Sequence, residues 1–261
     1  MNKISVQTDN PVAWDSPDHL APFGTVRDNN TDAAYLSSVL SHFGRNNISV
    51  LDLGCAGGQL VTDFIAAGAT AVGLEGSTEA AGGAGAKNWK ELHNKNLFFC
   101  DLTKPYQVSF DGQPAQFDFI HCWEVVEHIA PADLTAFLGY INHHLSDEGV
   151  FCCSIALYPS YGIVDGKQID LHQSLFNPAW WVNTLFESGF ELCVDSQWPP
   201  MPEKDVPAHR KFDPELKYDS DADEGIVLKQ QGLFLGYLFK DAMFRNHDRH
   251  KSSVYFCLRK K

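Results

Sequence analysis

The chain has 261 residues, of which 44% are hydrophobic and 20% charged, a balance that excludes a disordered or fibrous protein and suits one α/β domain with insertions. Lys and Arg number 20 against 33 Asp and Glu, and the formal net charge of −13 disfavours nucleic acid and anionic membranes as partners. No run approaches the roughly 18–20 apolar residues that cross a bilayer, and the cysteines lie mostly inside short apolar runs, so we expect a cytoplasmic protein with reduced thiols and no membrane insertion.

The N-terminal residues predict an irregular segment followed by a helix. Residues 1–30 contain three prolines and an Asn-Asn pair and lack an apolar signal core, which is typical of chain draped over a domain. We expect Trp14 and Phe23 to anchor this segment. Apolar residues at helical spacing over 31–43, with Gly44 just after them, predict a helix that leads into the first strand.

Strand and helix patterns then alternate, which predicts a parallel sheet covered on both faces. The expected strands are 48–53, 70–75, 97–102, 116–123 and 149–157, and the expected helices between them are 58–67, 86–94 and 131–145. A helix over 177–188, a strand over 190–198 and a last strand over 252–260 follow. No internal repeat is visible, so we predict a single domain.

The residues between the last two strands predict an insertion. The stretch 199–214 holds five prolines, an acidic run covers 219–224, and residues 233–244 are apolar enough to be a helix candidate. We therefore divide the domain into an N-terminal cap segment (1–47), a cofactor-binding core (48–196), a lid or substrate insertion (197–250) and the last strand (251–261).

Three strand ends carry residues that suit a nucleoside. The turn after the first strand has glycines at Gly54, Gly57 and Gly58, where the backbone can approach a ligand closely. Glu75 ends the second strand, and its carboxylate can accept hydrogen bonds from two neighbouring ribose hydroxyls. After the third strand, the Asp101 carboxylate can receive an adenine amine and Leu102 can pack on the ring.

These residues resemble the class I S-adenosylmethionine-dependent methyltransferases over about residues 48–195. The resemblance implies an α/β, Rossmann-like methyltransferase fold with a mostly parallel seven-stranded sheet, helices on both faces and a C-terminal lid insertion. It implies S-adenosyl-L-methionine as cofactor, bound by Asp52, Gly54, Cys55, Gly57, Gly58, Glu75, Asp101 and Leu102. Trp123 would pack on the cofactor or simply fill space.

Two positions test this resemblance. Ala56 stands where many members of the family have glycine, and alanine fits there if its φ is negative. A dinucleotide site for NAD or FAD would need a glycine at position 60, which is Leu60. The sequence therefore favours the sulfonium cofactor.

The end of the fourth strand provides candidates for catalysis. Glu124, Glu127 and His128 are spaced i, i+3 and i+4, so on a helix they would share one face. This Glu-x-x-Glu-His stretch resembles small-molecule methyltransferases, including the ubiquinone-biosynthesis O-methyltransferases. It is also similar to the small-RNA 3′-end 2′-O-methyltransferases, which hold a divalent metal with these residues and a later histidine, and His172 has a similar place.

The resemblance implies a site for magnesium, manganese or zinc formed by Glu124, Glu127, His128 and His172. A site without metal, in which His128 or His172 is the general base beside Glu124, uses the same residues. We expect His121 to be a buried core residue or a wall of the cofactor pocket, and Cys152 and Cys153 to be core residues. One of Trp180 and Trp181 should be core while the other lines a cleft.

Two short segments point to the acceptor. Phe23–Asn29 and His172–Trp181 resemble methyltransferases of bacterial and viral glycan-modifying clusters. We therefore expect O-methylation of a hydroxyl of a sugar, glycan or related small molecule. The alternatives are a quinone, phenol or carboxylate natural product as acceptor, a binding or scaffold protein of the same fold without activity, and, disfavoured by charge, a nucleic acid.

Overall fold

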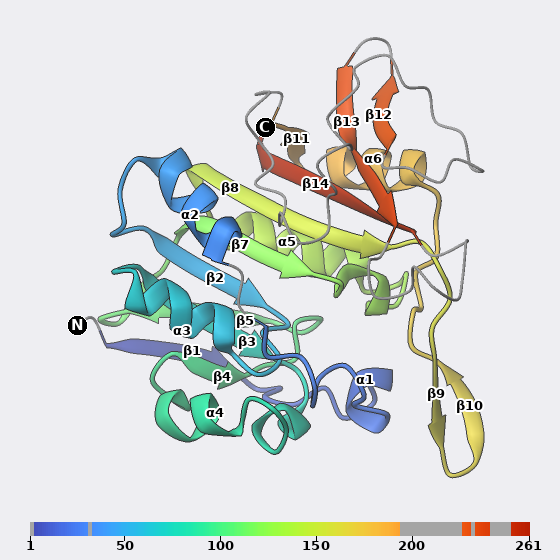
Figure 1. Cartoon of the computed structure of the whole chain (residues 1–261), viewed down its shortest axis with the longest axis horizontal. Coiled ribbons are helices and arrows are strands. Elements are labelled where there is room, and N and C mark those ends of the chain that lie inside the picture. The colour runs from blue at the N-terminus through green and yellow to red at the C-terminus, as the bar shows by residue number, and fades with distance from the viewer. Residues whose placement is uncertain (1–2, 31–32, 194–225, 231–232, 241–251) are drawn as a thin grey trace.

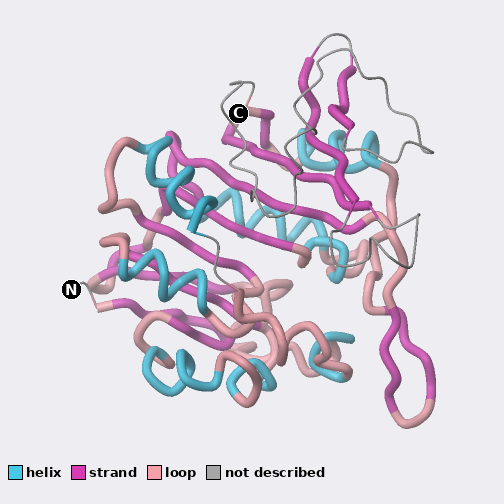
Figure 2. Tube along the Cα trace, viewed as in Figure 1, coloured by secondary structure: helices cyan, strands magenta, loops and turns pink. Residues whose placement is uncertain are grey.

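The computed structural model describes residues 3–30, 33–193, 226–230, 233–240 and 252–261 (Figure 1). A large sheet with helices on both faces forms the centre of this part of the chain (Figure 2). Within the described residues no helix has the length and apolarity needed to span a membrane. The predicted lid over 197–250 and the end of the strand predicted over 190–198 lie largely outside the described residues.

The described sheet has nine strands, and five of them form a parallel block. The block has the order β4 (Leu97–Phe99), β3 (Thr70–Glu75), β2 (Ser49–Leu53), β7 (Phe117–Trp123), β8 (Leu145–Ala156). The antiparallel strands are β14 (Ser252–Lys260), which pairs with β8, and β11 (Phe190–Leu192), β13 (Leu233–Lys240) and β12 (Ile226–Gln230). The parallel block, β14 and β11 are the seven strands that the sequence predicted, and β12 and β13 add two.

One predicted helix is wrong. Residues 233–244 were expected to be helical, but Leu233–Lys240 is strand β13, which pairs with β14 over Tyr237–Lys240. A continuous apolar run has neither the period of a helix nor that of a strand, so pairing partners far away in the sequence decide its structure. β13 and β11 share one edge of β14, because β11 pairs with its other half, Leu258–Lys260.

The helices cover the two faces of the sheet and complete two apolar cores (Figure 2). One face carries α2 (Ala33–Phe43), α3 (Gln59–Ala66) and α4 (Ala86–Leu92). The other face carries α5 (Leu134–His144), α6 (Pro178–Glu187) and the small antiparallel sheet β1 (Ile4–Thr8), β5 (Tyr106–Phe110) and β6 (Gln113–Pro114). Cys152 and Cys153 are fully buried, which confirms the prediction for them, and they face opposite cores.

The N-terminal residues differ from the prediction. Residues 4–8 form β1, which pairs with β5, and Pro17–Leu20 form the short helix α1, so the segment is not irregular throughout. Trp14 and Phe23 are each 63% exposed and are not anchors. The ring of Trp14 lies perpendicular to that of His19, and the Arg27 guanidinium lies over Phe23. Backbone hydrogen bonds to the edge of the sheet and to the loop before α4 hold the segment instead.

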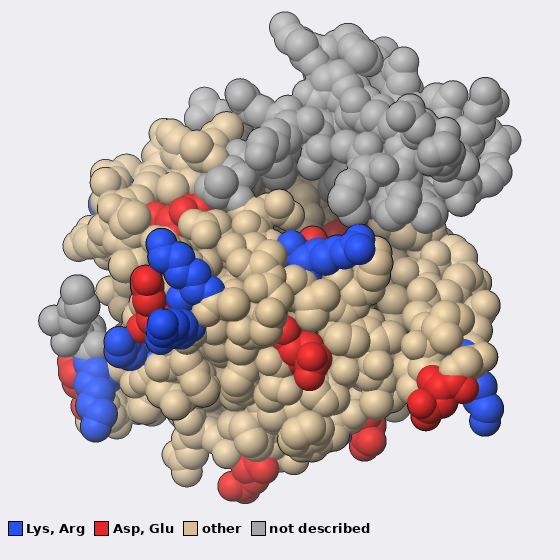
Figure 3. Space-filling model, turned by 60° about the horizontal axis from the view of Figure 1, so that its bottom comes forward, with Lys and Arg blue, Asp and Glu red and all other residues tan. Residues whose placement is uncertain are grey.

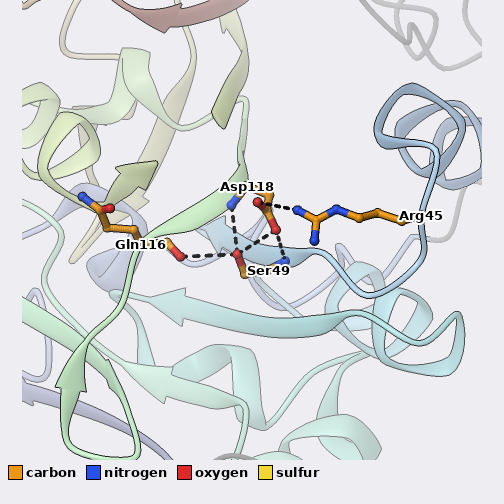
Figure 4. A network of polar contacts seen from close by, with 4 residues as sticks. All are labelled: Arg45, Ser49, Gln116 and Asp118. Atoms are coloured by element: carbon orange, nitrogen blue, oxygen red, sulfur yellow. Dashed lines mark hydrogen bonds and ion pairs between the residues drawn. The ribbon is translucent and has the colours of Figure 1, made fainter. Parts of the chain in front are cut away.

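A polar network fixes the amino ends of β2 and β7 (Figure 4). Asp118 accepts hydrogen bonds from the Ser49 backbone N–H at 2.8 Å and from Arg45 Nη2 at 2.9 Å. The Ser49 hydroxyl in turn accepts the Asp118 N–H at 2.9 Å. Because the register of two parallel strands is set at one end, this network also aligns their carboxyl ends, where the candidate site lies.

The carboxyl edge of the parallel block is surrounded by α1, the 3-10 helix η2 (Val126–His128) and a hairpin of β9 (Tyr161–Val164) and β10 (Lys167–Asp170) (Figure 1). A side chain at Gly162 would meet Ala21 Cβ at 2.6 Å, so the hairpin packs against the end of α1. On the face seen in Figure 3, basic and acidic side chains of the described residues form small separate groups.

Candidate active site

The turn between β2 and α3 is held by close packing of protein on its glycines. Gly54 and Gly58 have φ of 70° and 74°, which favour glycine. A side chain at Gly54 would meet Val125 Cγ2 at 2.4 Å, and one at Gly57 would meet Asn29 Oδ1 at 2.4 Å. Protein neighbours thus require glycine at these positions, in addition to the close approach of a ligand that the sequence predicts.

Ala56, in the same turn, has a strained backbone. Its φ is 43°, and not the negative value at which alanine fits this position without strain. Two hydrogen bonds hold this conformation: the Ala56 N–H donates to Glu75 Oε2 at 2.9 Å, and Trp89 Nε1 donates to the Ala56 carbonyl at 2.8 Å. A left-handed alanine persists only where its surroundings determine it, and here side chains from β3 and α4 do so.

Glu75 is buried at the end of β3, and the backbone holds both of its carboxylate oxygens. Oε1 accepts the Ser77 N–H at 2.9 Å, while Oε2 accepts the Ala56 N–H. Burial raises the pKa of Glu75 from 4.5 to about 7, against the lowering effect of these two hydrogen bonds, and the charges of Asp18 and Asp52 raise the pKa further. Its charge therefore changes near neutral pH.

The other predicted cofactor residues fall into two groups. Asp52 Oδ1 lies 3.0 Å from His121 Nδ1, and both residues are buried, so His121 is a core residue as expected. Trp123 stacks beside His121 with ring centroids 5.7 Å apart and packs on the α2 side of the sheet. Asp101 and Leu102 follow β4: Asp101 Oδ1 accepts the Thr103 hydroxyl at 2.7 Å, and Leu102 is buried.

Cys55 is buried in the glycine turn, beside Gly73 of the neighbouring strand. A side chain at Gly73 would meet Cys55 Sγ at 2.7 Å, so this thiol is part of the contact between β2 and β3. Burial raises the pKa of the Cys55 thiol well above its usual value, and the charges of Asp52 and Glu75 raise the pKa further. Cys55 is therefore an uncharged packing residue.

Residues 10–29, the part of the predicted N-terminal cap (1–47) to which the name cap segment is restricted from here on, cross the ends of β2, β3 and β4. Backbone hydrogen bonds join them to the sheet edge and to the loop before α4: Ala13 to Gly76 (2.9 Å), Asp101 to Asn10 (2.9 Å), Gly57 to Asp28 (2.9 Å) and Ala84 to Val26 (2.8 Å). His19 Nδ1 lies 3.1 Å from Ser77 Oγ, next to Glu75. The cap segment therefore forms one wall of the region around Glu75.

The Glu-x-x-Glu-His stretch does not form the expected helical face. Glu124 has φ of 52°, outside any helix, and the 3-10 helix η2 covers only Val126–His128. The Glu124 N–H donates to Ser154 Oγ at 2.9 Å, and Glu124 Oε2 accepts the Ser253 hydroxyl at 3.2 Å. Glu124 is thereby held by β8 and β14, and the prediction of a shared face for Glu124, Glu127 and His128 is wrong.

Three of the four predicted metal ligands nevertheless come together. Glu127, His128 and His172 each offer a ligand atom within 4.8 Å of the others, while Glu124 lies outside this group, which we name the donor cluster. The rings of His128 and His172 are 4.6 Å apart and nearly perpendicular. The Glu127 carbonyl accepts the N–H groups of Gln173 and Ser174, which brings the segment after β10 against η2.

Glu127 is the most deeply buried acid of the described chain, with an exposed fraction of 0%. Neither carboxylate oxygen has a hydrogen-bond partner of normal geometry among the described residues. Burial raises the pKa of Glu127 well above its usual value and the Glu124 charge raises the pKa further, while His128 and the nearby amides of Glu127 and Ala156 lower it. A buried carboxylate with so few partners is costly unless a cation or proton accompanies it.

The two histidines of the donor cluster each use Nδ1 to contact another part of the chain. His172 Nδ1 donates to the Tyr158 carbonyl at 2.5 Å, which places the ring proton on Nδ1. His128 Nδ1 lies 2.7 Å from Asp18 Oδ2 of the cap segment. Burial lowers the pKa of His128, but Asp18, Glu127 and Glu124 raise it, and the net result is a pKa of about 9.

One of the two tryptophans after His172 is a core residue, as expected. Trp181 is fully buried, and Trp180 is partly exposed and stacks on Phe176 with ring centroids 3.7 Å apart. Sequence reasoning missed Asp18, Ser154 and Ser253, whose contacts with the site join segments far apart in the chain. No local pattern in the sequence singles out Asp18.

Comparison with known proteins identifies the family. A family model described as "Methyltransferase domain" matches residues 26–193, which is more than half of the chain. The ubiquinone biosynthesis O-methyltransferase of Azoarcus sp. (strain BH72) is 29% identical over 127 residues, 47% of this chain and 48% of that protein. The one of Methylococcus capsulatus is 33% identical over 104 residues, 38% of this chain and 40% of that protein. The chain thus spans about half the length of these curated relatives or less.

Two solved structures share the fold. An S-adenosylmethionine-dependent methyltransferase from Clostridium acetobutylicum has a TM-score of 0.50 at 13% identity, covering 89% of this chain and 93% of that chain. The PH0226 protein from Pyrococcus horikoshii has a TM-score of 0.53 at 14% identity, covering 92% of this chain and 96% of that chain. The chain therefore belongs to the methyltransferase domain family and has the Rossmann-like fold of the class I S-adenosylmethionine-dependent methyltransferases.

Proposed function

We propose that this chain is an S-adenosylmethionine-dependent O-methyltransferase that acts on a hydroxyl of a sugar, glycan or related small molecule with the help of a divalent cation. One observation carries the proposal. The predicted cofactor residue Glu75 and the donor cluster lie on the same edge of the sheet, and one turn of the cap segment contacts both regions. In that turn His19 lies beside Ser77, and Asp18 lies beside His128.

For the cofactor, we assign the ends of β2, β3 and β4. Glu75 would accept the ribose hydroxyls, and Asp101 with Leu102 would contact the adenine. The glycine turn from Gly54 to Gly58, with Cys55, would lie along the rest of the molecule, while Asp52 would face its ammonium group through water or backbone. Trp123, which packs beside His121, would act by supporting this pocket from the core. When bound, S-adenosylmethionine supplies an electrophilic methyl group on a sulfonium sulfur.

The side chains of the donor cluster are suitable ligands for a divalent cation. It combines one carboxylate with two imidazoles, a set that suits zinc and manganese and, with added water, magnesium. The buried Glu127 carboxylate lacks a hydrogen-bond partner of normal geometry within the described chain, and a cation would compensate its charge. A bound cation would stabilise the alkoxide that forms from the acceptor hydroxyl.

The chain's own residues would complete the chemistry. Glu124 would stay with Ser253 and Ser154 at the border of the site, where it would orient the acceptor and, in the route with a cation, take the hydroxyl proton. In the route without metal, His172 Nε2 would take the hydroxyl proton, because the raised pKa of His128 keeps that imidazole protonated near neutral pH. In both routes the acceptor oxygen bonds to the methyl carbon as the carbon–sulfur bond breaks, so positioning supplies most of the rate.

A second acceptor class has support of its own. The cap segment and the β9–β10 hairpin pack on each other near the donor cluster. Both carry exposed apolar side chains, which are Trp14, Leu20, Phe23, Tyr161 and Ile163. The names of the curated relatives refer to ubiquinone biosynthesis. Both facts support a quinone or phenol acceptor as the second candidate, and phenols need less help to lose a proton.

The test begins with calorimetry of S-adenosylhomocysteine binding, because saturable binding is required by every version of the proposal. Labelled S-adenosylmethionine is then incubated with a panel of glycosides and a panel of phenols and hydroquinones, with and without a chelator. Transfer to glycosides that stops with the chelator supports the main proposal, and chelator-insensitive transfer to phenols supports the second. Absence of cofactor binding would instead leave a scaffold protein of the same fold.

A further inference from the structure

Asp18 is the charged residue of the cap segment that reaches the donor cluster. It lies in the first turn of α1, where Ser16 Oγ accepts the Asp18 N–H at 3.3 Å. Its side chain is 31% exposed, and its Oδ2 lies 2.7 Å from His128 Nδ1. α1 is thus placed so that a carboxylate from residue 18 contacts an imidazole from residue 128.

Each of the two histidines of the cluster has its Nδ1 against an oxygen of another segment. His172 Nδ1 donates to the Tyr158 carbonyl, and His128 Nδ1 faces the Asp18 carboxylate. Histidines that bind metals usually use one ring nitrogen for the metal while the other contacts a carboxylate or a carbonyl, which sets the orientation of the ring. By this pattern both rings would offer Nε2 to a cation beside Glu127.

Glu124 does not take the role of a further ligand in this arrangement. Its carboxylate accepts the Ser253 hydroxyl, its backbone is in the left-handed region, and it lies outside the group of mutually close donor atoms. The acid that contacts the cluster from another segment is therefore Asp18.

We propose that Asp18 is a positioning residue for a divalent cation at Glu127, His128 and His172, and that through Asp18 the cation and the cofactor bind cooperatively. This inference rests on the proposed function, because it requires both the cation site and the cofactor site. It adds a residue from the cap segment to that site and a coupling between its two halves.

The coupling follows from where the cap segment is attached. The same 20 residues that carry Asp18 also hydrogen-bond to Gly57, Gly76 and Asp101, around the predicted cofactor residues. A cation that fixes His128 and Asp18 would hold the cap segment in place over these strand ends. If the cation and the cofactor both favour this position of the cap segment, each must raise the affinity for the other by the same factor.

The experiment measures binding, so it needs no acceptor. Calorimetry gives the affinity of the wild-type chain for Mn²⁺ and Zn²⁺, and the absorption spectrum of bound Co²⁺ reports the ligand geometry. S-adenosylhomocysteine affinity is then measured with and without Mn²⁺. The variants are Asp18→Asn, which removes the charge, and Asp18→Glu, which keeps a carboxylate. Asp15→Asn is the control, because it removes the same charge from an exposed residue of the same segment.

We expect Asp18→Asn to weaken cation binding by about 10- to 100-fold and to change the Co²⁺ spectrum. It should also abolish the gain in S-adenosylhomocysteine affinity that Mn²⁺ gives the wild type. Asp18→Glu should restore part of both effects, and Asp15→Asn should behave as the wild type. Thermal unfolding of each variant shows that a loss of binding is not a loss of fold.

Three other results would overturn the inference. Equal cation affinity of wild type and Asp18→Asn would show that Asp18 has no positioning role. A large loss in Glu124→Gln with none in Asp18→Asn would assign the role to Glu124. S-adenosylhomocysteine binding that is independent of Mn²⁺ would remove the coupling. In each case the cofactor still binds, whereas failure of the proposed function would appear as no S-adenosylhomocysteine binding at all.

Discussion

The Glu75 carboxylate accepts the backbone N–H of Ala56, so the acid at the end of β3 fixes the strained residue of the turn that follows β2. Its other oxygen accepts the Ser77 N–H. One side chain thus joins two strand ends and would also contact the cofactor. Its substitution should therefore affect stability and binding together.

We expect Glu75→Gln to lower the free energy of unfolding by about 1–3 kcal/mol, because the amide NH₂ group would face one of these two backbone donors. S-adenosylhomocysteine affinity should fall at least tenfold. Urea unfolding and calorimetry measure the two effects, and Glu79→Gln is the matched control at an exposed position nearby. Unchanged affinity in Glu75→Gln would remove this residue from the cofactor site.

The pH dependence of stability follows from the raised pKa of Glu75, about 7 against an ordinary 4.5. Between these values the folded chain binds the proton more tightly than the unfolded chain does. The resulting stabilisation is complete below the ordinary pKa and is lost as pH rises through the folded pKa, a loss of roughly 3 kcal/mol at most. Urea unfolding across this range should show a steeper decline in the wild type than in Glu75→Gln.

The pH dependence of cofactor binding should have the opposite direction. Ribose hydroxyls donate to the ionised carboxylate, so S-adenosylhomocysteine affinity should rise between about pH 6 and 8 with release of a proton. Calorimetry in buffers of different ionisation enthalpy measures that proton. Affinity that is flat over this range would mean that Glu75 is already ionised in the free protein.

Ala56→Gly should stabilise the chain. Glycine adopts the φ of 43° without the steric cost that alanine has in the left-handed region, and we expect a gain of up to about 1 kcal/mol. Ala136→Gly, at an exposed position inside α5, should instead lose about 0.5–1 kcal/mol. Chemical denaturation of both variants gives the comparison, and a destabilised Ala56→Gly would show that the methyl group has a packing role.

Removal of the Glu127 charge should abolish cation binding without lowering the stability of the ion-free chain. At pH 8 and without divalent ions we expect Glu127→Gln to be at least as stable as the wild type, because a buried carboxylate with few partners is costly. Mn²⁺ at 100 times its dissociation constant should stabilise the wild type by about 2.7 kcal/mol and leave Glu127→Gln unchanged. Thermal unfolding measures both, with exposed Glu148→Gln as the control. Equal stabilisation of the variant would place the cation elsewhere.

The network at the amino ends of β2 and β7 should matter for stability alone. Asp118→Ala removes the acceptor of the Ser49 N–H and of Arg45, and we expect a loss of about 1–3 kcal/mol in unfolding free energy. S-adenosylhomocysteine affinity should stay within twofold of the wild type, because the opposite end of the strands forms the candidate site. A large change in affinity would show that strand register at this end controls the site.

Much of the fold could be predicted from local patterns. The strand over 70–75 has the predicted bounds, and the glycine turn lies where an apolar strand meets a helix. These features depend on neighbouring residues, whose apolar periodicity and turn chemistry are visible in a single sequence. The apolar run that forms β13 was misassigned, because its structure depends on pairing with β14.

The site could be predicted only in part for a related reason. Glu127, His128 and His172 come together as the motif suggested, but Glu124 does not share their face, because its backbone turns into the left-handed region. The contact of Asp18 with His128 joins residues 110 positions apart through the path of the cap segment. No periodicity or spacing in the sequence encodes such a contact.

The position of β14 has a consequence for biosynthesis. This strand lies between β8 and the pair β11 and β13, and its Ser253 holds the Glu124 carboxylate. Residues 252–260 leave the ribosome after every other described strand of the sheet has been translated. Until then the edge of β8 has no neighbour and Glu124 lacks this hydroxyl, so a nascent chain can assemble the parallel block well before it acquires the finished geometry around Glu124.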